Sequence, residues 1–302
     1  MHNKPKEEEG MKIINLGSIN IDHVYRVEHF VRPGETIRSE GYSIFSGGKG
    51  ANQSLALARA GAKVFHAGKI GHDGIWLKDK LQLDGVDTDL IETVGTPTGH
   101  ALIQVDKEGE NAIITHAGAN DTFTQEDIDT ILDSLKQGDY LLLQNEINGI
   151  EKVLEKAKDM SVIFNPAPMT DRVKGYPLEH VDIFIINETE GKTLTLEEDV
   201  DTILNTMQKL YPSSKTVLTL GEKGLIYSDQ YQKIKIAGLQ VTALDTTGAG
   251  DTFTGYFIAE LLRGSEIRSC LEMGVKASAL CVTREGAGDS IPKREEVENY
   301  EV

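Results

Sequence analysis

Short apolar runs alternate with longer amphipathic segments along most of this 302-residue chain. The runs that have the length of buried strands lie at 12–17, 63–67, 140–144, 161–164, 182–186 and 216–220. Segments with helical spacing of apolar residues lie at 75–83, 150–158, 203–210, 252–263 and 266–282. Because alternating strands and helices favour a parallel sheet with helices on both faces, the pattern predicts an α/β fold with a mostly parallel central sheet.

Two segments interrupt this alternation. Residues 24–46 alternate poorly and indicate short strands, and the runs at 100–105 and 112–116 flank Lys107-Glu108-Gly109-Glu110 like the arms of a hairpin. We predict that segments 24–46 and 98–116 form a small separate sheet within a single domain over 11–302. Residues 1–10 are polar and are predicted to be a disordered extension.

Local signals mark several helix starts. Thr124 with Asp127, and Asn148 with Glu151, have the spacing of a capping box and predict helices at both places. Trp76 lies on the predicted amphipathic helix 75–83, where we expect it in the core.

Charge and composition limit which binding partners and which cellular compartment we expect for this chain. The chain has 31 basic and 48 acidic residues, a net charge of −17, which argues against nucleic acid or an anionic membrane as a partner. It has no apolar run near the ~18 residues of a membrane span and no hydrophobic signal core, so we predict a cytoplasmic protein. Cys270 and Cys281 would lie roughly 16 Å apart on one helix, too far for a disulfide, and are predicted to be free and buried.

Glycine and polar clusters follow the predicted strands. They lie at 17–22, 46–53, 144–146, 187–190, 219–224 and 245–251. Ligands of open parallel sheets bind at the carboxyl ends of the strands, so this shared edge is the candidate site. Gly248 and Gly250 open a predicted helix, where backbone N–H groups favour an anion. Asp251 beside that anion has either a chemical role or the ordinary role of a helix cap.

Two longer motifs resemble the signatures of the ribokinase-like PfkB family of carbohydrate kinases. They are Gly47-Gly48-Lys49-Gly50-Ala51-Asn52-Gln53 and Asp245-Thr246-Thr247-Gly248-Ala249-Gly250-Asp251-Thr252-Phe253. Asn187-Glu188-Thr189-Glu190 resembles the family's N-x-x-E motif, and 116–120 and 165–168 also resemble ribokinase-like segments. The resemblance covers 11–298 and implies a three-layer α/β/α fold whose small sheet is a lid and a homodimer clasp.

The resemblance implies ATP-dependent phosphorylation of a sugar, with D-ribose phosphorylated at O5 to ribose 5-phosphate. Asp251 would be the general base, and the backbone N–H groups of Gly248, Ala249 and Gly250 would form the anion hole. The alternatives are another kinase of the family, acting on fructose, a ketodeoxy sugar acid or a nucleoside, and a non-catalytic sugar-binding sensor. A sensor needs no base, so Asp251 argues against it.

The same resemblance implies ligands for each substrate and cofactor. Sugar contacts are expected at Asn20, Asp22, Gly48, Lys49, Asn52, Glu146 and Asp251. Nucleotide contacts are expected at Asn187, Thr219, Leu220, Gly221, Glu222, Lys223, Gly224, Gly250 and Val275. Mg²⁺ is expected near Glu190 through water, and K⁺ near Asp245, Thr247, Cys281, Arg284, Gly286 and Ser290.

Ordinary structural roles remain open for several of these residues. Asn20 and Asp22 suit a turn, Asn52 a helix cap, and Glu146 a solvated strand end. The loop 219–224 suits a plain hairpin turn, and Asp245 and Ser290 suit turn hydrogen bonds.

Overall fold

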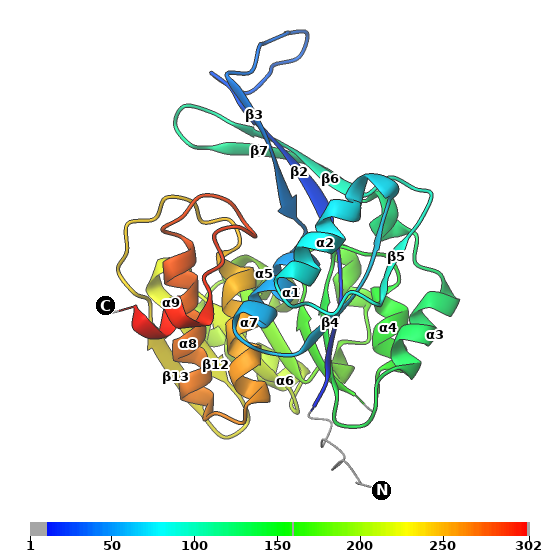
Figure 1. The fold of residues 1–302 in the computed structure, drawn as a ribbon. Helices are drawn as coiled ribbons and strands as arrows, with labels where there is room; N and C mark the ends of the chain where they lie inside the picture. The colour runs from blue at the N-terminus through cyan, green and yellow to red at the C-terminus, as the bar shows by residue number, and fades with distance from the viewer. Residues whose placement is uncertain (1–10, 159, 301–302) are drawn as a thin grey trace, which may run out of the picture.

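A nine-stranded sheet forms the centre of the molecule in the computed structural model, which describes residues 11–158 and 160–300 (Figure 1). The predicted disordered extension 1–10 lies outside the described residues. The strand order is β13-β12-β11-β10-β9-β8-β1-β4-β5. The strands are β1 (Ile13–Leu16), β4 (Val64–Ile70), β5 (Ile91–Thr93), β8 (Tyr140–Gln144), β9 (Ser161–Asn165), β10 (Ile183–Asn187), β11 (Lys215–Thr219), β12 (Gly224–Ser228) and β13 (Lys233–Ala237). Pairing is parallel from β5 to β11 and antiparallel for β12 and β13, so the predicted mostly parallel sheet is confirmed.

Helices cover both faces of this sheet because successive strand side chains point to opposite sides. Ile13 packs into one core cluster and Ile14 into the other. The first cluster lies under α1 (Lys49–Arg59), α2 (Ile75–Leu83), α7 (Ala249–Leu262), α8 (Ile267–Cys281) and α9 (Arg294–Asn299). The second lies under α3 (Gln125–Asp133), α4 (Ile150–Lys156), α5 (Glu188–Thr195) and α6 (Val200–Leu210). The result is the predicted α/β/α arrangement.

A second sheet projects from this body (Figure 1). Its order is β3-β2-β6-β7, with β2 (Asn20–Arg26), β3 (Gly41–Gly47), β6 (Gly99–Val105) and β7 (Asn111–His116). It starts earlier than the predicted residue 24, so that Asn20 and Asp22 lie in a strand and not in a turn. We call this sheet the lid.

Two local predictions are wrong. Asn148 does not cap α4, because Gly149 in the left-handed region (φ 81°) begins that helix, and Asn148 bonds instead to the backbone of Phe123. Trp76 is 38% exposed on the outer face of α2 and lies outside the core. The capping box of Thr124 and Asp127 is confirmed at the start of α3.

Cys270 and Cys281 are buried and free on α8, as predicted. Burial raises the pKa of the Cys270 thiol to about 11, so this thiol stays protonated. Within residues 11–158 and 160–300, no helix has the length and apolar character needed to cross a bilayer.

Candidate active site

The predicted glycine and polar clusters meet at one edge of the central sheet. The chain leaves β1 on one side for β4 and returns on the other side for β8, so β1 lies at the switch point where open α/β sheets bind ligands. A cavity of about 340 Å³ opens there. Its lining comes from several separate parts of the chain and includes Lys49, Asn187, Glu190, Thr219, Gly248, Gly250 and Asp251.

Asp251 lies in the first turn of α7 and is only 7% exposed. The helix begins after Gly248, whose φ of 79° suits glycine, and no side chain of the described residues caps it. The cap alternative for Asp251 is therefore wrong. Its carboxylate accepts hydrogen bonds across the site, from Asn52 Nδ2 at 3.2 Å and Gln53 Nε2 at 2.9 Å.

Lys49 stands among three acidic side chains. It is the first residue of α1, and the nearby carboxylates of Asp251, Glu146 and Glu190 raise the pKa of its ammonium, Asp251 most strongly. Glu146 accepts hydrogen bonds from the Lys49 backbone N–H at 2.9 Å and from the Ser18 hydroxyl. Glu146 is therefore fixed in place and is not a freely solvated strand end.

Asp22 and Asn20 extend the site onto the lid. Burial, with the nearby charge of Glu146, raises the pKa of Asp22 from 3.8 to about 7. The carboxylate lies over Gly47, where a Cβ atom would come within 2.1 Å of Asp22 Oδ2, so only glycine leaves room for it. Asn20 Oδ1 accepts a hydrogen bond from Asn120 Nδ2 at 2.7 Å. The Asp22 carboxylate thus lies beside the turn that leads into α1, and the backbone of Asn20 lies against Gly48 in the same turn.

Asn187 and Glu190 form a capping box at the start of α5, which the sequence analysis read only as a family motif. The Asn187 backbone N–H donates to Glu190 Oε2 at 2.9 Å, and the Glu190 N–H donates back to Asn187 Oδ1 at 2.9 Å. Burial raises the pKa of Glu190, while the Asn187 hydrogen bond and Lys49 oppose the change. Both side chains keep free lone pairs on oxygen, the donor atoms that Mg²⁺ accepts directly or through water.

A second cavity, of about 290 Å³, adjoins the first and shares Thr219, Thr246 and Gly250 with it. Four predicted nucleotide residues also line it: Gly221, Glu222, Gly224 and Val275. Leu220 instead packs into the core, and the side chain of Lys223 is exposed. The apolar walls include Leu239, Val241, Phe253, Ala279 and Val282, which the sequence analysis missed. A mainly apolar cavity beside a polar one suits a base joined to phosphates.

The predicted potassium residues surround the loop between α8 and α9. Asp245 accepts hydrogen bonds from the backbone N–H groups of Thr247 at 2.9 Å and Gly286 at 3.0 Å. Although burial opposes it, these bonds hold the pKa of Asp245 below its ordinary value. Ser290 is fully buried and donates to the Ala287 carbonyl, and the Cys281 carbonyl accepts from the Arg284 N–H. The turn hydrogen bonds that we gave as the structural alternative for Asp245 and Ser290 are thus present. The groups that surround the loop also offer carboxylate, hydroxyl and carbonyl oxygens, the ligand atoms that a hard cation binds.

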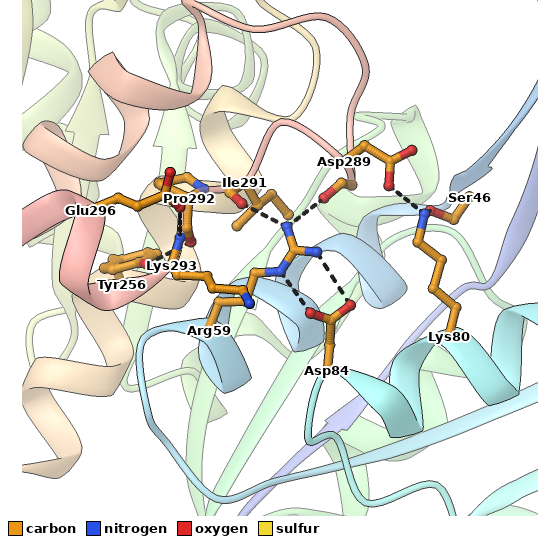
Figure 2. A network of polar contacts seen from close by, with 11 residues as sticks. Ser46, Arg59, Lys80, Asp84, Tyr256, Asp289, Ile291, Pro292, Lys293 and Glu296 are labelled. Carbon is orange, nitrogen blue, oxygen red and sulfur yellow. Dashed lines mark hydrogen bonds and ion pairs between the residues drawn. The ribbon is translucent and has the colours of Figure 1, made fainter.

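A polar network anchors this loop to the body (Figure 2). Arg59 donates to the carbonyls of Gly288 at 3.1 Å and Ile291 at 2.6 Å, and its other nitrogens bind both oxygens of Asp84. Lys80 bridges Asp289 and the hydroxyl of Ser46 at the base of the lid. The loop is therefore tied to α1, to α2 and to the lid.

We expect Arg59→Ala to lower the free energy of unfolding by about 3 kcal/mol, because it leaves the carboxylate of Asp84 and two carbonyl groups without their hydrogen-bond donor. Equilibrium urea denaturation measures the change. Arg268→Ala is the matched control, since its pair with Glu272 is more than half exposed, and it should stay within about 0.5 kcal/mol of the parent. Equal losses in both variants would contradict an anchoring role for Arg59.

Three buried amide side chains next to the site received no role in the sequence analysis. They are Gln53, Gln144 and Asn15. All three are fully buried, and Gln53 contacts Asp251 directly. Amide side chains at buried strand and helix positions are the only signal that could have marked them.

Comparisons with known proteins agree with this geometry. Residues 11–294 match the family described as pfkB family carbohydrate kinase. The chain is 39% identical over 295 residues to the ribokinase of Haemophilus influenzae, covering 93% of this chain and 95% of that protein. Its fold is similar to the crystal structure of ribokinase from Cryptococcus neoformans var. grubii in complex with ADP (TM-score 0.84, 34% identity, 96% and 99% of the two chains). It is also similar to Arabidopsis thaliana ribokinase complexed with ribose and ATP (TM-score 0.84, 29% identity, 96% and 98%). This chain therefore belongs to the pfkB family of carbohydrate kinases.

Proposed function

We propose that this chain transfers the γ-phosphoryl group of ATP to O5 of D-ribose, giving ribose 5-phosphate and ADP. As a member of the family, it is an ATP-dependent carbohydrate kinase. The observation that carries the proposal is the position of Asp251. Its buried carboxylate lines the polar cavity, next to the second cavity that we assign to the nucleotide. The similarity to structures named as ribokinases with ADP, or with ribose and ATP, supports ribose as the sugar.

The proposed chemistry uses the residues in order around that cavity. Asp251 accepts the proton of the sugar hydroxyl. The hydroxyl oxygen of the sugar forms the new bond to the γ-phosphorus of ATP, and the bond from that phosphorus to the ADP oxygen breaks. The backbone N–H groups of Gly248 and Gly250 and the positive end of α7 stabilise charge on the transferring group, whereas the Ala249 N–H donates to the Thr246 carbonyl at 3.3 Å. Lys49 adds a positive charge at the same cavity. Mg²⁺, held through water by Glu190 and Asn187, would neutralise phosphate charge when bound.

Sugar binding is assigned to the wall formed by the lid and α1. Asp22, Asn20 and Glu146 offer carboxylate and amide groups that match a hydroxyl-rich ligand. Gly48 approaches the backbone of Asn20 so closely that a Cβ atom would lie 2.9 Å from its nitrogen, which keeps this wall compact. Asn52 reaches Asp251 from the same helix turn.

A panel of sugars with coupled ADP detection tests the proposal. Ribose should give the highest kcat/KM among ribose, 2-deoxyribose, fructose, a ketodeoxy sugar acid and a nucleoside. A clearly higher kcat/KM for 2-deoxyribose, fructose, the sugar acid or the nucleoside than for ribose would overturn the choice of sugar. Sugar binding without any ADP release would favour the sensor.

We propose that K⁺ binds at the loop between α8 and α9, because carboxylate, hydroxyl and carbonyl oxygens there suit a hard cation. Replacing K⁺ by tetramethylammonium should lower kcat/KM severalfold, since that cation is too large to sit among these oxygen atoms. A protease-protection assay of the loop, with and without K⁺, gives a readout independent of activity. Unchanged rates and unchanged protection would remove the site.

Two further proposals concern assembly and location. Exposed apolar side chains gather on one face of the lid at Tyr42, Ile44, Leu102 and Ile114. Such a patch on a sheet suits a second copy of the chain, so we propose a homodimer through the lid. Two free buried thiols suit a reducing compartment, which supports the cytoplasm.

A further inference from the structure

A line of buried amide groups leads from Asp251 through the core. Gln53, Gln144 and Asn15 come from α1, β8 and β1, and each is 0% exposed. Gln53 Nε2 donates to Asp251 Oδ1 at 2.9 Å, and Gln53 Oε1 accepts from Gln144 Nε2 at 2.6 Å. Gln144 Nε2 also donates to Asn15 Oδ1 at 2.9 Å. We call these three residues the amide relay.

The amide groups of the relay can be oriented in only one way, because each of their N–H hydrogens already has an acceptor. A terminal amide carries two N–H hydrogens. Those of Gln53 go to Asp251 Oδ1 and to Asn165 Oδ1 at 3.1 Å. Those of Asn15 go to the Gly50 carbonyl at 2.7 Å and the Ser54 hydroxyl at 2.8 Å. Turning the Gln53 amide over would set its oxygen against the Asp251 carboxylate and its N–H groups against those of Gln144.

The far end of the relay is buried as well. Ser54 Oγ accepts a hydrogen from Asn15 Nδ2 and pairs with His66 Nδ1 at 2.8 Å, where the tautomer of the ring decides which atom donates. Burial lowers the pKa of His66 to about 4, so the imidazole is neutral at neutral pH and places no charge beside the relay. Gly17 makes room for Gln144, since a Cβ atom there would lie 2.1 Å from Gln144 Oε1.

We propose that Gln53 is a positioning residue for phosphoryl transfer, held in one orientation by Gln144 and Asn15 so that it fixes the Asp251 carboxylate toward the sugar hydroxyl. The proposal rests on the proposed role of Asp251 as the base. Gln53 has no exposed surface with which to touch the sugar, so it acts through Asp251. Gln53 and Asn52 each occupy one oxygen of Asp251, which leaves other lone pairs free to receive the proton. A buried polar network in which every donor hydrogen has an acceptor favours one geometry, and Gln144 Oε1 is the one amide oxygen of the relay without a partner among the described residues.

Gln53→Met keeps the length of the side chain and removes the amide. We expect kcat to fall about 10- to 100-fold, the loss typical of one hydrogen bond to a charged group. The KM values for ribose and ATP should stay within about threefold, because the substrate contacts remain. Ser214→Ala is the matched control: it removes a buried hydrogen bond to the Val181 carbonyl, far from the site, and should keep the parent kcat.

A double-mutant cycle separates positioning from general destabilisation. In an Asp251→Asn background, Gln53→Met should change kcat by less than about threefold, because its effect passes through the missing carboxylate. The proposal would be overturned if Gln53→Met lowered kcat as much in the Asp251→Asn background as in the parent. It would also be overturned if the Gln53→Met single variant kept the parent kcat. If Gln53→Met does not fold, Gln144→Met tests the same relay by freeing Gln53 Oε1, and its smaller loss should show the same non-additivity. If Asp251→Asn alone keeps the parent kcat, the proposed base fails first, which distinguishes the two failures.

Discussion

Asp251→Asn should lower kcat by about 10²- to 10⁴-fold, the usual contribution of a general base. The substitution keeps the size of the side chain but removes the group that receives the sugar's proton. Nucleotide affinity should not change, because Asp251 does not line the adjoining cavity of about 290 Å³. Steady-state kinetics give kcat, and calorimetric titration with ADP gives the affinity.

Asp171→Asn is the control for that experiment. Asp171 is an exposed acid paired with Lys174 at the surface, and its variant should match the parent in both measurements. An Asp251→Asn enzyme with kcat within about threefold of the parent would contradict the assignment and leave Asp251 a structural partner of Asn52 and Gln53.

Asp22→Ala should raise the KM for ribose by about 10²-fold or more. Two hydrogen bonds from sugar hydroxyls to a carboxylate contribute about 1.5–3 kcal/mol each, and both would be lost. The KM for ATP, measured in the same assay, should stay near the parent value because Asp22 belongs to the lid side of the site. Glu108→Ala, at the exposed tip of the β6–β7 hairpin, is the matched lid control. An unchanged KM for ribose would remove Asp22 from the sugar site.

The raised pKa of Asp22 adds a pH dependence to the same prediction. A carboxyl group with a pKa of about 7 is mostly protonated at pH 6 and mostly ionised at pH 8. Sugar hydroxyls donate more strongly to the ionised form, so the KM for ribose should fall about tenfold from pH 6 to pH 8. Asp22→Asn should remove this dependence. The same slope in both proteins would assign it to another group.

The regular elements could be predicted because their signals are local. Helix 75–83 and strand 140–144 appear with the predicted bounds, since apolar spacing and flanking polar residues define both. The capping box of Thr124 was readable for the same reason. Asn148 has the same spacing to Glu151, but Gly149 takes the left-handed conformation and starts the helix one residue later.

Other features depend on contacts that spacing does not show. Helix α5 was missed because only eight residues follow its N-cap residue Asn187 and few of them are apolar. The relay joins residues 91 and 129 positions apart, so it exists only once β1, β8 and α1 are assembled. Asp251 could be picked out from its neighbours in sequence, but the partners that fix its carboxylate could not.

Identification of the product tests the central claim most directly. The purified chain is incubated with ATP, Mg²⁺, K⁺ and D-ribose, and the phosphorylated sugar is examined by ³¹P–¹H correlation NMR. The account predicts ribose 5-phosphate in amounts equal to the ADP formed, with none from Asp251→Asn over the same interval. Phosphate on another hydroxyl, or ADP released with free phosphate and no phosphorylated sugar, would contradict it.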